Sequence, residues 1–125
     1  MRIVARTPCF PTEDKEKVRQ ALLNIFPQSE IEENENEMIA RSDSGDKLRQ
    51  IILDHHIRDT ARSILLCGCV GKRTFFRLNK QVASVGKISF VEGAPPLGSI
   101  DVEIEAEDLD GAIDFLAEST VEVNE

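Results

Sequence analysis

The chain has 125 residues, 41% of them hydrophobic and 30% charged, a composition typical of a globular protein rather than a disordered one. No apolar run approaches the ~20 residues that a membrane-spanning helix needs, and residues 1–6 show no signal-peptide pattern. We therefore expect a cytoplasmic protein with no membrane partner. The 23 acidic and 15 basic side chains give a formal net charge of −8, which argues against attraction of a polyanion by net charge alone.

The first third of the chain predicts a strand, a helix and a pair of strands. Residues 2–9 alternate moderately between apolar and polar side chains, as a strand does. Thr12 and the acidic residues after it predict a helix N-terminus, and the apolar stripe at residues 18–26 continues that helix. The polar segment at residues 29–36 predicts the start of a strand followed by a turn around residues 34–36, and residues 38–41 predict the returning strand.

Helical periodicity resumes in the middle of the chain. Apolar residues recur at helical spacing through residues 46–67, which predicts either one bent helix or two helices in series. Gly68 and Gly71 end this region. His55 lies on the apolar side of the predicted helix, so we expect it to be a packed, structural histidine.

The last part of the chain predicts mostly strands. In residues 73–79 the period changes to two, so that Arg73, Phe75, Arg77 and Asn79 share one strand face. The remaining predicted segments are a second strand at 83–91, a loop at 92–96, a strand at 100–105, a helix from 108 to about 116, and a frayed tail after Thr120.

This order of elements predicts the fold class. Helices are grouped between strands, and several strands follow one another late in the chain. That pattern favours an α+β fold of two layers, with a largely antiparallel sheet and helices on one face, over a parallel doubly wound fold. The sequence contains no repeat and no linker, so we expect residues 1–125 to form a single domain.

Charge is distributed unevenly along the chain. Residues 41–87 carry ten basic and four acidic side chains, whereas residues 88–125 carry eleven acidic side chains and no basic ones. We therefore predict that the middle third binds RNA phosphates on one continuous positive surface. The predicted phosphate contacts are Arg58, Arg62, Lys72, Arg73, Arg77, Lys80 and Lys87. The predicted base contacts are Phe75, Asn79 and Gln81. The alternative is a solvated sheet face with Phe75 packed elsewhere.

The sequence offers no convincing metal, cofactor or catalytic motif. Cys67 and Cys69 are too close for the usual zinc knuckle, and the adjacent side chains of His55 and His56 cannot both face one metal on a helix. Compared with a phosphate-binding loop that ends in Gly71-Lys72, the chain has Leu66 where the first glycine is required and Arg73 where Ser or Thr is required. We therefore expect no cofactor, no metal and no enzymatic activity, with a general base at His55 or His56 as the remaining alternative.

Four stretches together resemble the motifs of one known family. They are P-T-E-D-x-x-K-V at 11–18, I-x-D-T-A-R at 57–62, F-x-L-N-K-Q-x-A at 76–83 and P-L-G-x-I at 96–100. The set resembles a family of small archaeal proteins of uncharacterised role that is catalogued as RNA-binding. This resemblance implies a fold similar to ribosomal protein L-five and, by analogy of fold, RNA binding.

The same resemblance leaves a second role open. Some relatives resemble one half of a fusion whose other half is a P-loop, nucleotide-kinase-like domain. The alternative function is therefore a non-enzymatic partner or regulatory domain of a nucleotide-kinase-like protein, with a homodimer through its sheet as one form of this role. In that case the acidic surface of residues 101–118, or the sheet edge, is the expected interface.

Overall fold

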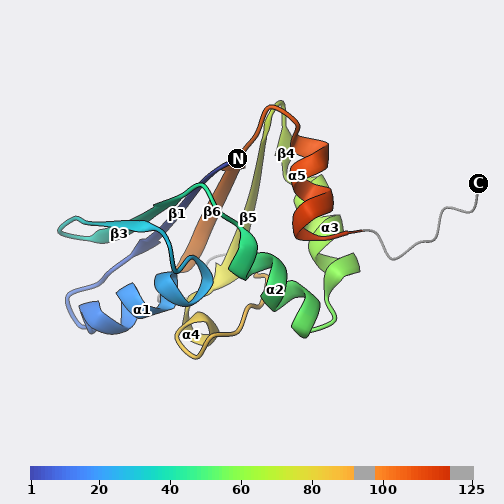
Figure 1. The fold of residues 1–125 in the computed structure, drawn as a ribbon. Coiled ribbons are helices and arrows are strands. Elements are labelled where there is room, and N and C mark those ends of the chain that lie inside the picture. The colour runs from blue at the N-terminus through green and yellow to red at the C-terminus, as the bar shows by residue number, and fades with distance from the viewer. Residues whose placement is uncertain (92–97, 119–125) are drawn as a thin grey trace, which may run out of the picture.

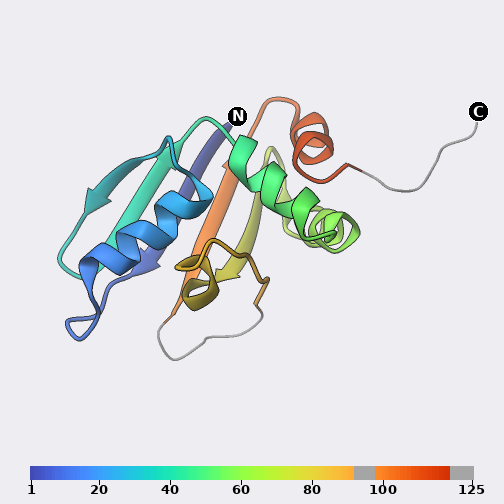
Figure 2. The same cartoon turned by 60° about the horizontal axis from the view of Figure 1, so that its bottom comes forward.

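The computed structural model describes residues 1–91 and 98–118. Among these residues, six strands form one sheet in the order β2-β3-β1-β6-β5-β4, and every pair of neighbouring strands is antiparallel. The helices lie together over one face of this sheet (Figure 1; Figure 2). The predicted α+β fold, with a largely antiparallel sheet and helices on one face, is confirmed.

The elements follow the predicted order in most of the chain. They are β1 (Arg2–Pro8), α1 (Lys15–Ile25), β2 (Glu30–Glu33), β3 (Glu37–Ser42), α2 (Asp46–Asp54), α3 (Arg58–Cys67), β4 (Cys69–Val70), β5 (Arg73–Asn79), α4 (Lys80–Ala83), β6 (Ser99–Glu105) and α5 (Leu109–Leu116). The predicted loop at 92–96, the first two residues of the 96–100 motif and the tail after Thr120 lie outside the described residues.

The core lies between the sheet and the helices. Alternate residues of the central strands point into it, among them Ile3 and Ala5 of β1 and Ile104 of β6, which are fully buried. The apolar stripe of α1 covers this face through residues such as Leu22 and Ile25. Burial of each large apolar side chain contributes about 1.5–3 kcal/mol, so this layer is the main source of stability.

The N-cap of helix α1 lies two residues later than Thr12, the predicted N-cap. Asp14 is the N-cap, because its carboxylate accepts a hydrogen bond from the backbone N–H of Glu16 at 3.0 Å. Glu13 accepts from the backbone N–H of Phe10 at 3.1 Å, which folds the segment before the helix into a turn.

The region predicted as one or two helices is two helices, α2 and α3. The backbone N–H groups of His56 and Ile57 bond the carbonyls of Leu53 and Ile52, both at 3.2 Å, and His56 has a left-handed φ of 56°. This pattern of bonds is a Schellman motif, which ends a helix. The expectation that His55 packs in the core is wrong: both histidines are exposed, because the helix ends at Asp54.

The strand predicted at 83–91 is also wrong. The side chain of Asn79 accepts hydrogen bonds from the backbone N–H groups of Gln81 and Val82, so it caps the short helix α4, which takes up the first residue of the predicted strand. Gly86, with φ of 80°, then turns the chain. A single bridge from Phe90 to Leu78 is the one strand-like pairing within the described part of this segment.

Candidate nucleic-acid interface

The face of the sheet opposite the helices carries the polar side chains of the strands. In β5, Arg73, Phe75 and Arg77 alternate with buried residues and are exposed on this open face, as the sequence predicted. Strand register places further residues on the same face. They are Arg2, Val4 and Arg6 of β1, Ile39 and Arg41 of β3, and Asp101, Glu103 and Glu105 of β6.

The acidic residues of β6 lie directly beside the arginines of β5. Arg73 pairs in register with Glu105, and its guanidinium donates to Glu105 at 2.9 Å and to Glu103 at 3.3 Å. Arg77 pairs in register with Asp101, and the two side chains form an ion pair at 3.4 Å. Each arginine of this strand therefore lies beside a carboxylate that offsets its charge.

These carboxylates also fix the arginine side chains. The hydrogen bond to Glu105 and the negative charges of Glu105 and Glu103 raise the pKa of Arg73 above its ordinary value. A fork of hydrogen bonds to two carboxylates restrains the planar guanidinium more than a single bond would. The pairs are solvent-exposed, so they orient the side chains and contribute little to the stability of the fold.

Phe75 is an exposed aromatic residue in the middle of this row. Its side chain is 50% exposed, and it lies between Arg73 and Arg77 on the same strand and opposite Glu103 on β6. An exposed phenylalanine on an open sheet is a suitable surface for stacking of an unpaired base.

Other predicted phosphate contacts lie away from this row. Arg62 of α3 pairs with Asp114 and donates to the backbone carbonyl of Ala117 at 3.2 Å, so it joins α3 to the end of α5. Lys72, in the turn before β5, pairs with Glu107. Arg58 is half-buried at the first position of α3.

Within residues 79–81, the side chains of Asn79 and Lys80 make contacts inside the fold and are not exposed for RNA. Lys80 is only 5% exposed; its ammonium group donates to Glu13 at 2.7 Å and to the carbonyl of Pro8, and lies 5.6 Å from the Phe10 ring centroid. The side-chain oxygen of Asn79 caps α4. Gln81 and Lys87 are exposed, on α4 and in the segment that follows it.

The predicted cations therefore do not assemble into one continuous positive surface. Arg62, Lys72, Arg73, Arg77 and Lys80 each have a carboxylate partner. Arg58 and Lys87 have no carboxylate partner within residues 1–91 and 98–118. The pairing of β5 with the acidic strand β6 accounts for Arg73 and Arg77, and the packing of helices and turns brings carboxylates to Arg62, Lys72 and Lys80.

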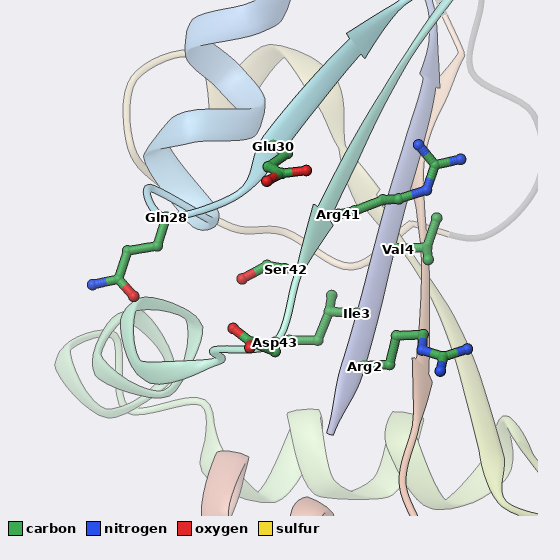
Figure 3. Close-up of a pocket in the computed structure, with 8 residues that line it drawn as sticks. All are labelled: Arg2, Ile3, Val4, Gln28, Glu30, Arg41, Ser42 and Asp43. Atoms are coloured by element: carbon green, nitrogen blue, oxygen red, sulfur yellow. The ribbon is translucent and has the colours of Figure 1, made fainter.

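The structure adds arginines that the prediction left out. Arg2 and Arg41 extend the open face across β1 and β3, and they line an open hollow of about 590 Å³ together with Val4 and Ser42 (Figure 3). Both form ion pairs at 3.5 Å, with Glu105 and Glu32 respectively. Arg2 lies outside the basic middle third, and Arg41 is its first residue; strand register is what places both on this face.

Two further properties concern the described part of the chain as a whole. None of its helices is both long and apolar enough to cross a membrane. Nor do three or more His, Cys, Asp or Glu side chains gather there in a group suited to a metal ion.

Several known proteins are similar to this chain. Residues 2–106 match the model of a protein family described as RNA binding. The chain belongs to this family. A UPF0201 protein of Methanothermobacter thermautotrophicus is 39% identical over 119 residues, which cover 93% of this chain and 90% of that protein.

Two other proteins similar to this chain add information on fold and on length. The crystal structure of a UPF0201 protein from Methanococcus jannaschii has a TM-score of 0.90 and 32% identity, with coverage of 99% of this chain and 100% of that chain. A UPF0200/UPF0201 protein of Archaeoglobus fulgidus is 37% identical over 96% of this chain, which covers only 38% of that longer protein. The similarity to ribosomal protein L-five remains a prediction.

Proposed function

We propose that this protein binds single-stranded RNA across the open face of its sheet, with Phe75 as the stacking surface. The observation that carries the proposal is the exposed Phe75 ring, on a sheet face that no helix covers in the described structure (Figure 2). The description of the family model as RNA binding supports the same function. Base stacking on an aromatic side chain is worth about 1–3 kcal/mol per base and is largely independent of sequence.

The polar residues around Phe75 suit bases better than phosphates. Arg73 and Arg77 lie beside carboxylates, so an RNA phosphate must compete with Glu105 and Asp101 for their guanidinium groups. Carboxylates accept hydrogen bonds from the amino groups of bases, while arginines donate to base carbonyls and ring nitrogens. The arginine–carboxylate pairs of β5 and β6 therefore present both hydrogen-bond donors and acceptors at fixed positions beside the Phe75 ring.

This arrangement predicts a weak dependence of affinity on salt. Each phosphate contact to a single strand contributes a slope of about −0.7 in log K against log salt concentration. If only Arg58 and Lys87 contact phosphates, the slope is about −1.4, whereas all seven predicted cations would give about −4.9. Binding isotherms of a fluorescent single-stranded RNA between about 50 and 300 mM salt distinguish the two cases.

The stacking role is tested with Phe75→Ala. We expect the affinity for a single-stranded RNA to fall about 5- to 150-fold, which corresponds to the energy of one stacked base. The matched control is Val85→Ala, which removes an exposed apolar side chain that lies off the sheet face, after α4. Equal affinities of Phe75→Ala and the unchanged protein, with both folded by circular dichroism, would contradict the proposal.

A protein-docking role is the second candidate, and one observation favours it. The open face has alternating rows of arginines and carboxylates, which is a self-complementary pattern of charge. Such a face suits a second copy of the chain, or a protein partner such as a nucleotide-kinase-like protein. The longer UPF0200/UPF0201 relative supports association with another protein segment.

One variant tests the homodimer through this face. Arg77→Glu places like charges beside Asp101, and a sheet-face dimer should then dissociate, as measured by light scattering after gel filtration. A dimer that persists in this variant, or a protein that is monomeric from the start, excludes a homodimer through this face. A stoichiometric protein partner recovered without nucleic acid would favour docking over RNA binding.

A further inference from the structure

An open pocket of about 850 Å³ lies beside the outer edge of β5, between this strand and α3. Its position follows from how the edge of β5 is paired. The backbone N–H of Phe75 bonds the carbonyl of Gly68 at 3.2 Å, and the N–H of Val91 bonds the carbonyl of Arg77 at 3.1 Å. The pocket therefore lies along the part of the β5 edge between its bond to Gly68 and its bond to Val91.

The floor of the pocket is aromatic. The rings of Phe76 and Phe90 meet edge to face, with centroids 5.9 Å apart and an angle of 66°. Phe90 is held in place by its bridge to Leu78. The exposed ring of Phe75 lines the same pocket, so a bound molecule can contact aromatic rings of both strand β5 and the segment that contains Phe90.

Two hydroxyl groups on α3 complete the lining. Thr60 and Ser63 are one helical turn apart and both are exposed. Neither hydroxyl has a hydrogen-bond partner among the residues that the structure describes. The hydroxyl of Thr74, by contrast, donates to a backbone carbonyl at 2.5 Å. The two unpartnered hydroxyls can each donate or accept a bond to an occupant.

Thr60 also differs from its neighbours in the D-T-A-R stretch. Ala61 is fully buried against the core, and Arg62 joins α3 to α5, so the packing of the fold accounts for both. The side chain of Thr60 lines the pocket and contributes no hydrogen bond to the described structure.

We propose that this pocket binds an unstacked nucleobase. A base is a flat heteroaromatic ring whose edge carries both donors and acceptors, which matches an aromatic floor with hydroxyls that can do either. The volume lies within the range of about 300–1,000 Å³ found for small-ligand pockets. The inference rests on the proposed RNA binding: Phe75 belongs to both the open face and the pocket, so a strand on that face can place a base over the edge of β5.

Cys67 provides a direct reporter of occupancy, because it is an exposed free thiol that lines the pocket. The intact protein is treated with iodoacetamide, and alkylation of Cys67 is followed by mass spectrometry. Cys9, which is buried, is the internal reference. The probes are a single-stranded RNA octamer of mixed sequence and, separately, the four nucleoside 5′-monophosphates. We expect the RNA to slow alkylation of Cys67 severalfold.

The double variant Thr60→Val/Ser63→Ala tests the contacts. We expect it to bind the octamer at least about fivefold more weakly, since two hydrogen bonds are removed, and to lose the protection of Cys67. Thr12→Val is the matched control, because Thr12 is an exposed threonine outside the pocket. The variants replace exposed side chains, so their thermal unfolding should match that of the unchanged protein.

The outcomes separate this inference from the proposed function. RNA binding without protection of Cys67, and with no effect of the double variant, overturns the pocket while leaving the RNA function in place. Protection by a free monophosphate without RNA binding supports the pocket as a nucleotide site and overturns the RNA function. Absence of protection by any probe overturns the base pocket.

Discussion

Replacement of Lys80 by methionine removes a cation from a nearly closed site. The ammonium group is bonded to Glu13 at 2.7 Å and to the carbonyl of Pro8, and it lies 5.6 Å from the centroid of the Phe10 ring. These contacts connect the first residue of α4 to the segment between β1 and α1. Methionine has a similar length and is apolar, so the substitution keeps the volume while it removes the charge.

The expected loss of stability is large, because Glu13 remains behind. The side chain of Glu13 is 14% exposed; its carboxylate then keeps the hydrogen bond from the backbone N–H of Phe10, at 3.1 Å, but has no cation partner among the described residues. Removal of one partner of a buried ion pair costs about 3–5 kcal/mol. For a domain of this size, about 4 °C of melting temperature corresponds to 1 kcal/mol, so we expect a decrease of about 12–20 °C.

Urea unfolding followed by far-UV circular dichroism measures this change. Lys87→Met is the control, since Lys87 is exposed and its replacement should alter the free energy of unfolding by less than about 0.5 kcal/mol. A double-mutant cycle with Glu13→Gln should give a coupling energy of about 0.5–3 kcal/mol. A free energy of unfolding for Lys80→Met within about 1 kcal/mol of the unchanged protein would refute this account of the site.

Three further changes are measured by the same unfolding experiment. Thr7→Val should raise the free energy of unfolding by about 1 kcal/mol, because the buried hydroxyl of Thr7 has no partner among the described residues. Thr74→Val should lower the free energy of unfolding by a similar amount, because it removes a hydrogen bond. A change of the same sign in both variants would contradict this reasoning. Gly68→Ala should cost at least about 2 kcal/mol, since a Cβ there would lie 2.1 Å from the carbonyl oxygen of Phe75, and a neutral result would exclude such close packing. Asn79→Ala should cost about 1 kcal/mol through loss of the α4 cap, and an unchanged midpoint would argue against that cap.

Sequence alternation could predict the β5 row of the candidate RNA interface. The period of two in residues 73–79 placed Arg73, Phe75 and Arg77 on one face, and the structure has them there. Alternation could not show that the acidic face of β6 lies beside this row. That arrangement depends on which strands pair and in which register, and β5 and β6 are separated by about twenty residues of chain.

The same limit explains the errors in local structure. Residues 83–91 alternate well enough to predict a strand, but the cap at Asn79 starts a helix and Gly86 turns the chain. The burial of Lys80 could not be predicted from local sequence either, because its partner Glu13 is 67 residues away in the chain. A basic residue in a basic segment looks like a surface cation until the fold brings a carboxylate to it.

The sequence by itself determined the α+β class, the order of most elements and the open face of β5, since each depends on side-chain periodicity within a few neighbouring residues. Tertiary structure alone decided which charges are offset, which lysine is buried, and that Thr60, Ser63 and Phe90 line one pocket with Phe75. The physical reason is that ion pairing and burial depend on distance in space, which strand register and helix packing set between segments far apart in the chain.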